Sequence, residues 1–126
     1  MMTKEQVYGM PFSKVWPLLE QKALRKGRTE EEVMAVVTWL TGYQREDILT
    51  MLEDGTKYGD FFRSAPAMNP DRFRIKGSVC GVKLEEIEDP LMRDIRYLDK
   101  LIDELAKGKA LEKILRTAGT KGPGRE

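Results

Sequence analysis

The stretch of sequence that decides the fold runs from Gly77 to Leu115 and reads GSVCGVKLEEIEDPLMRDIRYLDKLIDELAKGKALEKIL. Near its centre, Asp89 is placed to act as a helix N-cap, and Pro90 follows where the first helical residue belongs. Apolar side chains then recur at alternating spacings of four and three residues, forming one stripe: Leu91, Ile95, Leu98, Ile102 and Leu105. This pattern predicts a long helix over residues 90–106.

The other face of this predicted helix is charged. Pairs of opposite charge stand four residues apart and support a helix weakly: Asp89 with Arg93, Lys100 with Glu104, and Asp103 with Lys107. Gly108 is placed to end the helix, and residues 110–116 are predicted to form a shorter one. The apolar stripe fits either the core of a monomer or the interface of a homodimer, and the sequence leaves both open.

The rest of the chain is also dominated by helical periodicity. Val7 and Tyr8 suggest one short extended stretch, and Asn69-Pro70 repeats the pairing of a cap with a proline. Between them the pattern predicts four helices, namely Ser13 to Lys26, Thr29 (with a capping box to Glu32) to Gly42, Arg45 to Asp54, and a short helix capped by Thr56 that carries Tyr58, Phe61 and Phe62.

The segment from Ile75 to Leu84 is ambiguous between strand, loop and helix. No partner strand is visible elsewhere, so we predict a buried loop or a short helix there. The fold class is therefore all-α, a single-domain orthogonal multihelical bundle with a long C-terminal helix. We expect one helical domain over residues 1–116, and a flexible tail over residues 117–126 because that segment is polar and rich in glycine.

Composition excludes several classes of protein. The chain has no histidine and a single cysteine, Cys80, so histidine-dependent nucleophilic catalysis and the usual zinc sites are excluded. We predict no metal and no cofactor. The net charge of +1 lacks the basic excess of a dedicated nucleic-acid binder. No apolar run approaches the roughly 18 residues that cross a bilayer, and no secretory signal is visible, so we predict a cytoplasmic location without membrane contact.

Several motifs along the chain occur together in one family of small bacterial proteins. They are Tyr8-x-Met10-Pro11-Phe12, Lys26-Gly27-Arg28-Thr29-x-Glu31-Glu32-Val33, Trp39-Leu40-Thr41-Gly42-Tyr43, Ala65-Pro66-x-Met68-Asn69-Pro70, Ile75-Lys76-Gly77, and the block from Val79 to Leu101. On these motifs the sequence resembles the family catalogued as domain of unknown function 2200, over roughly residues 6 to 116. The resemblance implies a bacterial, cytoplasmic, multihelical protein, and it implies neither an activity nor site residues.

The strongest candidate for a ligand site is a short basic run. Three cations, Arg72, Arg74 and Lys76, alternate with Phe73 and Ile75. Together with Asn69 and Lys83 they could receive a phosphate or a carboxylate. The alternative is that the run is a solvated edge of the domain.

Two further features lie close to this run. One is an acidic cluster made of Glu85, Glu86, Glu88 and Asp89. These carboxylates either bind Mg²⁺ or act as acid and base, or they only stabilise the start of a helix. Cys80 is either a reactive thiol or a small buried hydrophobic residue.

Three functions remain. The leading hypothesis is a non-catalytic binding or interaction module, whose partner is an unknown protein or a small anionic ligand. The second is a small-ligand-binding protein or enzyme that uses the carboxylates and arginines of residues 69–89. The third is a helix-turn-helix nucleic-acid binder made of the two helices around Gly42, which the acidic character of residues 45–54 disfavours.

Overall fold

The computed structural model describes residues 3–79 and 81–115, so Cys80 and the predicted tail lie outside the described residues. These residues are mostly helical, as the fold class predicted. The elements in chain order are α1 (Lys4–Tyr8), α2 (Phe12–Leu24), α3 (Glu30–Thr41), α4 (Arg45–Met51), α5 (Tyr58–Arg63), the 3₁₀ helix η1 (Pro70–Arg74), β1 (Ser78–Val79), β2 (Val82–Lys83), the 3₁₀ helix η2 (Leu84–Glu86), α6 (Pro90–Ala106) and α7 (Leu111–Ile114). None of the helices described is long and apolar enough to span a bilayer.

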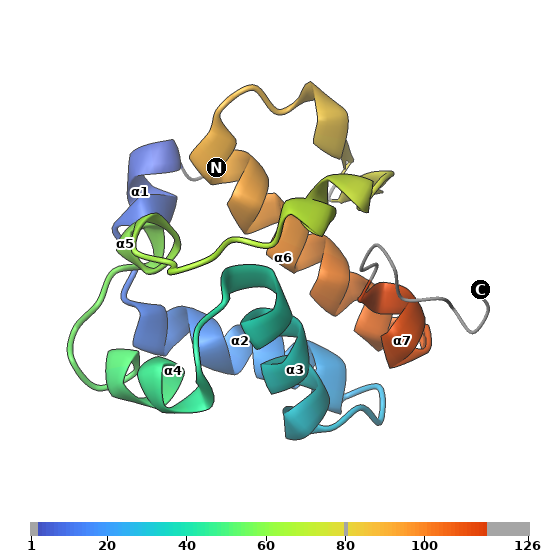
Figure 1. Ribbon diagram of the computed structural model, residues 1–126, viewed down its shortest axis with the longest axis horizontal. Helices are drawn as coiled ribbons and strands as arrows, with labels where there is room; N and C mark the ends of the chain where they lie inside the picture. The colour runs from blue at the N-terminus through green and yellow to red at the C-terminus, as the bar shows by residue number, and fades with distance from the viewer. Residues whose placement is uncertain (1–2, 80, 116–126) are drawn as a thin grey trace.

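The long helix α6 is the centre of the molecule. Figure 1 shows it crossing the middle of the fold, and α2, α3, α5, α7, β1 and η2 all contact it. The predicted bounds of 90–106 are confirmed, and the Asp89 side chain accepts hydrogen bonds from the backbone N–H groups of Leu91 and Met92. Four residues of the predicted stripe are buried, namely Ile95, Leu98, Ile102 and Leu105. The stripe therefore packs inside the chain's own core.

A second group of buried residues joins α2 to α5. The rings of Phe12 and Phe61 stack with centroids 4.2 Å apart, and Tyr43 stacks on the same Phe61 ring at 4.9 Å. The Tyr43 hydroxyl donates a hydrogen bond to the Phe61 carbonyl at 2.7 Å. These aromatic contacts fix α5 and the end of α3 against the start of α2.

The end of α3 is closed by a segment that is distant in the sequence. Gly42 adopts a φ of +79°, and a Cβ there would lie 2.8 Å from the Cβ of Ala67. The backbone N–H of Asn69 donates to the Leu40 carbonyl, and its side-chain Nδ2 donates to the Trp39 carbonyl at 3.2 Å. Glycine is therefore required at this turn both by its backbone conformation and by the close approach of Ala67.

The prediction of a buried loop or short helix for residues 75–84 was wrong in two respects, because most of the described segment is exposed and part of it forms strands. Ser78–Val79 pairs with Val82–Lys83 as a two-stranded antiparallel hairpin, with Gly81 at a φ of +80° between them. Each strand has only two residues, which is too short to show an alternation of apolar and polar side chains in the sequence. The remainder of the segment is a loop and the short helix η2.

Some predicted details at the ends of elements also differ. Residues around Val7 belong to helix α1, which is capped by Thr3 and Gln6, and α2 begins at Phe12 rather than after Ser13. The predicted helix over 45–54 is shorter, because α4 ends at Met51.

One predicted ion pair of α6 forms and two are replaced. Lys107 Nζ lies 3.1 Å from Asp103. Arg93, by contrast, donates to the carbonyls of Ile87 and Glu85 rather than to Asp89. Lys100 donates to the Ser78 carbonyl, while Glu104, which is buried, pairs with Lys109 at 3.4 Å. The segment from η2 to the start of α6, the neighbouring hairpin and the α6–α7 loop supply these partners.

Candidate functional site

A groove lies where the C-terminal ends of α2 and α6 meet. Its volume is about 550 Å³, and it is lined by Lys22, Arg25, Lys26, Asp103, Ala106 and Lys107. We call these six residues the basic groove. A volume of this size falls in the range of about 300–1,000 Å³ that is typical of small-molecule sites.

The amphipathic pattern of the two helices turns these side chains outward. Leu19 and Ala23 of α2 and Ile102 and Leu105 of α6 are buried between the helices. Side chains that flank this buried seam emerge along its edge, so the cations of α2 stand beside Asp103 and Lys107 of α6. Cations in the last turn of a helix also offset the negative end of its dipole.

The basic groove carries an excess of positive charge. Asp103 lies between two lysines, 3.4 Å from Lys22 Nζ and 3.1 Å from Lys107 Nζ. Burial alone would raise the pKa of Asp103, but the hydrogen bonds and charges of Lys107 and Lys22 outweigh burial and lower it. Arg25 donates to the neutral amide of Gln21, and no carboxylate of the described chain forms an ion pair with Arg25 or Lys26. Four cations and one carboxylate leave a net charge of +3.

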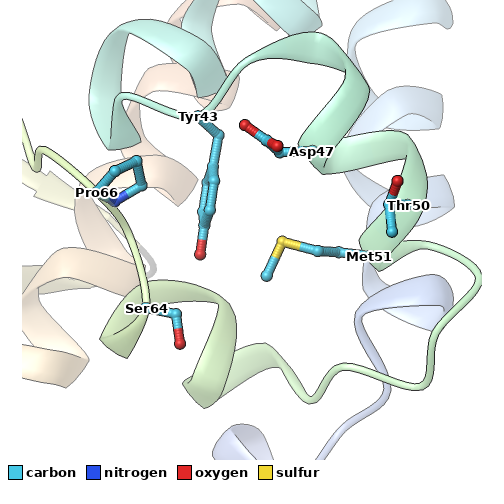
Figure 2. A pocket seen from close by; sticks show the side chains of 6 residues that line it. All are labelled: Tyr43, Asp47, Thr50, Met51, Ser64 and Pro66. Carbon is cyan, nitrogen blue, oxygen red and sulfur yellow. The ribbon is translucent and has the colours of Figure 1, made fainter.

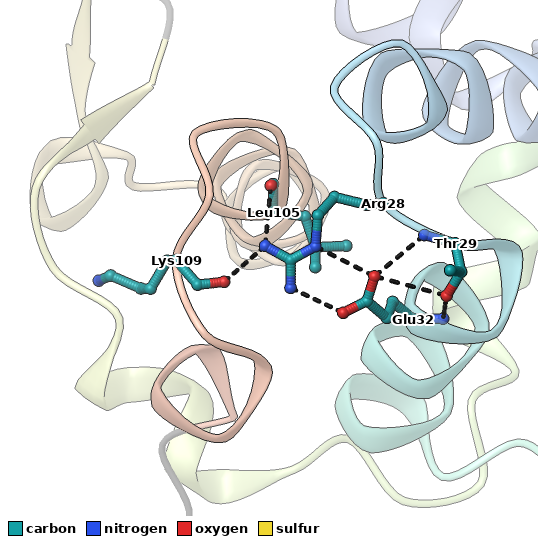
Figure 3. A network of polar contacts seen from close by, with 5 residues as sticks. All are labelled: Arg28, Thr29, Glu32, Leu105 and Lys109. Atoms are coloured by element: carbon teal, nitrogen blue, oxygen red, sulfur yellow. Dashed lines mark hydrogen bonds and ion pairs between the residues drawn. The ribbon is translucent and has the colours of Figure 1, made fainter.

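Arg28 holds the two walls of the basic groove together. Figure 3 shows its guanidinium between the start of α3 and the end of α6. Nε and Nη2 donate to the two carboxylate oxygens of Glu32 at 3.0 and 2.7 Å, and Nη1 donates to the carbonyls of Leu105 and Lys109 at 3.2 and 2.7 Å. The hydrogen bond from Arg28, with one from the Thr29 N–H, lowers the pKa of Glu32 to about 2. Because Glu32 stays ionised, Arg28 fixes the loop after α2 against the loop after α6.

Two of the residues predicted from the basic run, Asn69 and Arg72, contact each other. Asn69 caps η1 with its side-chain oxygen and α3 with its side-chain nitrogen. Arg72 Nε pairs with Asp94 at 2.9 Å, and Arg72 Nη1 donates to the Asn69 carbonyl. Asn69 and Arg72 therefore meet, but both make contacts that hold the fold together.

The other predicted site residues are exposed. Arg74 is exposed and pairs with Asp71 at 3.2 Å. The remaining members are also exposed, namely Lys76, Lys83, Glu85 and Glu86. Glu85 reaches its neighbours through its backbone carbonyl, which accepts a hydrogen bond from Arg93 Nη2 at 3.3 Å. A ligand site made of all seven predicted residues remains a prediction.

Comparison with known proteins places the chain in a family. The model of "Uncharacterized protein conserved in bacteria (DUF2200)" matches residues 6–116. The chain belongs to the DUF2200 family. It is also similar to a solved structure titled "Crystal structure of uncharacterized protein SP1917", with 48% identity, a TM-score of 0.86, and coverage of 91% of this chain and 94% of that chain. The comparison with curated proteins found no match.

Sequence reasoning missed the basic groove in this DUF2200 protein. The available signal was the spacing of Lys22, Arg25 and Lys26, which puts three cations on one face at the end of a helix. Lys107, the fourth cation, is eighty-one residues away from Lys26 in the chain, and only the packing of α2 on α6 brings the two together. The motif Lys26-Gly27-Arg28-Thr29 supplies one cation of the groove and the arginine that positions its walls.

A second hollow of the DUF2200 protein lies between α4 and α5. It has a volume of about 380 Å³ and is lined by Tyr43, Asp47, Thr50, Met51, Ser64 and Pro66. Figure 2 shows the side chains of Tyr43 and Met51 facing each other across it. Burial, with the charge of Asp47, raises the pKa of Tyr43 to about 12, so its hydroxyl stays protonated. Because the first turn of α4 carries Glu46 and Asp47, this side of the molecule does not favour contact with nucleic-acid phosphates.

Proposed function

We propose that this chain is a non-catalytic binding module that holds a small anionic ligand in the basic groove. The observation that carries the proposal is the net charge of +3 on one concave surface. The whole chain has a net charge of only +1, so the groove concentrates positive charge that acidic surface elsewhere balances. A hollow lined by charge of one sign attracts ligands of the opposite sign.

The chemistry of the groove favours a ligand with more than one phosphate group. Lysine ammonium groups act as compact point charges and bind phosphate oxygens from several directions. Ala106 supplies only a methyl group, so most of the affinity has to come from charge. A diphosphate matches the excess of three cations better than a single carboxylate does. A small ligand is also favoured over a protein partner because the surface is concave.

The groove contains no group suited to acid–base catalysis. Its carboxylate, Asp103, has a lowered pKa and two lysine partners, so it is a weak base near neutral pH. The absence of histidine from the whole chain supports the same interpretation. The single cysteine supports a cytoplasmic location, where phosphorylated small molecules are abundant.

Titration calorimetry with inorganic pyrophosphate tests the proposal. The decisive variant is Lys26→Gln with Lys107→Gln, which removes two charges and leaves the Lys22–Asp103 ion pair in place. We expect its affinity for pyrophosphate to fall about tenfold or more, and the affinity of the wild type to fall as salt is added. Lys14→Gln with Lys57→Gln is the matched control, because it also removes two charges and both are exposed lysines that do not line the groove.

The two results that would overturn the proposal are distinct. No heat of binding to the wild type at low salt would remove the anion site. An equal loss of affinity in Lys14→Gln with Lys57→Gln would show that net charge, and not the groove, attracts pyrophosphate.

A further inference from the structure

A smaller cleft lies at the opposite end of α6 from the basic groove. Its volume is about 230 Å³, and it is lined by Arg72, Phe73, Glu88, Pro90, Arg93 and Asp94. We call these residues the Phe73 cleft. Its lining residues come from η1, from the segment before α6 and from the first turns of that helix. This volume is below the range of drug-sized sites, so the cleft suits a ligand no larger than a single amino acid.

One wall of the Phe73 cleft is apolar and held in place. Phe73 leaves 51% of its surface exposed, which is unusual for a large aromatic side chain. Its ring meets Tyr97 edge-on at 6.1 Å, and Arg72 Cζ lies 4.5 Å from its centroid. Pro90 is exposed beside it. A fixed, half-open aromatic ring in a hollow is the kind of anchor on which ligand side chains pack.

Two of the four charges in the cleft neutralise each other. The side chains of Arg72 and Asp94 are both only 17% exposed, and they pair at 2.9 Å. Burial raises the pKa of Asp94, and the hydrogen bond and charge of Arg72 oppose that rise. This pair forms part of the structure and leaves no net charge for a ligand.

The other two charges have no ion-pair partner in residues 3–79 and 81–115. Arg93 donates to the carbonyls of Ile87 at 2.9 Å and Glu85 at 3.3 Å, which orient the guanidinium. Its charge also acts on Asp94, but the two form no ion pair. Glu88 is exposed and likewise makes no ion pair. The cleft therefore presents one cation and one anion beside an apolar wall.

We infer that the Phe73 cleft binds a free α-amino acid with an apolar side chain. The ligand carboxylate pairs with the Arg93 guanidinium, and the ligand ammonium pairs with the Glu88 carboxylate. The apolar side chain packs on Phe73 and Pro90. A zwitterion matches the cleft in sign at both ends, whereas a simple anion would face Glu88 and a simple cation would face Arg93. The inference is independent of the basic groove, which lies at the other end of α6.

The test is a titration of the ¹⁵N-labelled protein with L-leucine, 4-methylpentanoate and 3-methylbutylamine, followed by amide chemical shifts. The last two ligands keep the leucine side chain and each lack one charge. We expect L-leucine to shift the amides of Phe73, Glu88 and Arg93 and to bind about tenfold tighter than either analogue. An absence of shifts at millimolar L-leucine, or equal binding of L-leucine and 4-methylpentanoate, would overturn the inference.

Two exposed residues allow the test to be repeated without loss of the fold. Glu88→Gln should bind L-leucine and 4-methylpentanoate equally, because the partner of the ammonium is gone. Phe73→Ala should weaken binding of all three ligands about tenfold. Glu86→Gln is the control, since Glu86 is an exposed carboxylate near the cleft but outside its lining. Full preference for L-leucine over 4-methylpentanoate in Glu88→Gln would also overturn the inference.

Discussion

The two ends of α6 use basic side chains in different ways. At its C-terminal end, Lys26 and Arg25 make no ion pair with described residues, and Lys107 is 72% exposed beside Asp103. At its N-terminal end, Arg72 donates to the carboxylate of Asp94 and to the carbonyl of Asn69. The lysine ammonium groups are hydrated point charges, whereas the planar guanidinium groups bridge fixed acceptors.

Because of this difference, some basic side chains contribute mainly to the stability of the fold and others are available to bind a ligand. Cations that hold no other part of the chain can be neutralised with little effect on folding, so their removal reports on a ligand. Arginines that join distant segments stabilise the fold, so their removal reports mainly on stability. Arg28 belongs to the second class although it lies beside the basic groove, because it donates to Glu32, Leu105 and Lys109.

The largest expected effect is that of Arg28→Ala. The change removes a bidentate ion pair and two hydrogen bonds, one to the end of α6 and one to the loop after it. We therefore expect the free energy of unfolding to fall by about 2–3 kcal/mol at pH 7. Urea denaturation measures it, with Arg25→Ala as the control. Arg28→Lys should recover little, because an ammonium cannot span the same acceptors. A loss no greater than that of Arg25→Ala would show that the network does not hold the groove walls.

The effect of Arg28→Ala should also depend on pH. The pKa of Glu32 is about 2 in the fold and is lowered chiefly by Arg28, so the ion pair stabilises the fold above the ordinary glutamate pKa. This contribution is lost as the pH falls through about 4 towards 2, where Glu32 becomes protonated. The difference between wild type and variant should therefore shrink at acid pH to the part due to the Leu105 and Lys109 carbonyls.

An intermediate effect is expected for Arg72→Ala in the Phe73 cleft. The change leaves the partly buried Asp94 carboxylate without its cation, and we expect a loss of about 1–2 kcal/mol at pH 7. Burial already raises the pKa of Asp94, and removing Arg72 raises it further. Protonation then relieves the cost, so the loss should be smaller at pH 4 than at pH 7. The control is the double variant Arg72→Ala with Asp94→Asn, which has no carboxylate at position 94. Compared with Asp94→Asn alone, its loss of stability in urea denaturation should be the same at pH 7 and pH 4.

The smallest effect on stability is expected for Lys26→Gln with Lys107→Gln. Both side chains are exposed, and surface ion pairs such as Lys107–Asp103 contribute little to stability. The free energy of unfolding should therefore change by less than about 0.5 kcal/mol. Urea denaturation beside the pyrophosphate titration checks this. A large loss of stability would mean that these lysines hold the fold as the arginines do, and the comparison between the two ends of α6 would fail.

The sequence predicted correctly those features that depend on contacts between residues a few positions apart. Asp89 and Pro90 marked the start of α6 correctly because capping involves residues two or three positions apart. The Thr29–Glu32 capping box formed as predicted for the same reason. The hairpin at 78–83 was missed because two strands of two residues each have no clear alternation of apolar and polar side chains.

The sites were harder to predict than the helices. The sequence shows the charges of the run from Arg72 to Lys76 but not the partners that Arg72 and Arg74 have in the fold. Asp94 is twenty-two residues from Arg72, and nothing local indicates that the two pair. The basic groove shows the converse, since Lys26 and Lys107 were unremarkable separately and form a site only through the packing of α2 on α6.

By itself, the sequence determined the all-α fold class, the 90–106 helix and its caps, and the family. These depend on periodicity and on contacts within one helical turn, which are written in neighbouring residues. The tertiary structure alone decided which charges are neutralised and which stand together at the two ends of α6. Electrostatic interactions depend on distance in space, and the chain brings residues such as Lys26 and Lys107 together only after its apolar stripes have packed.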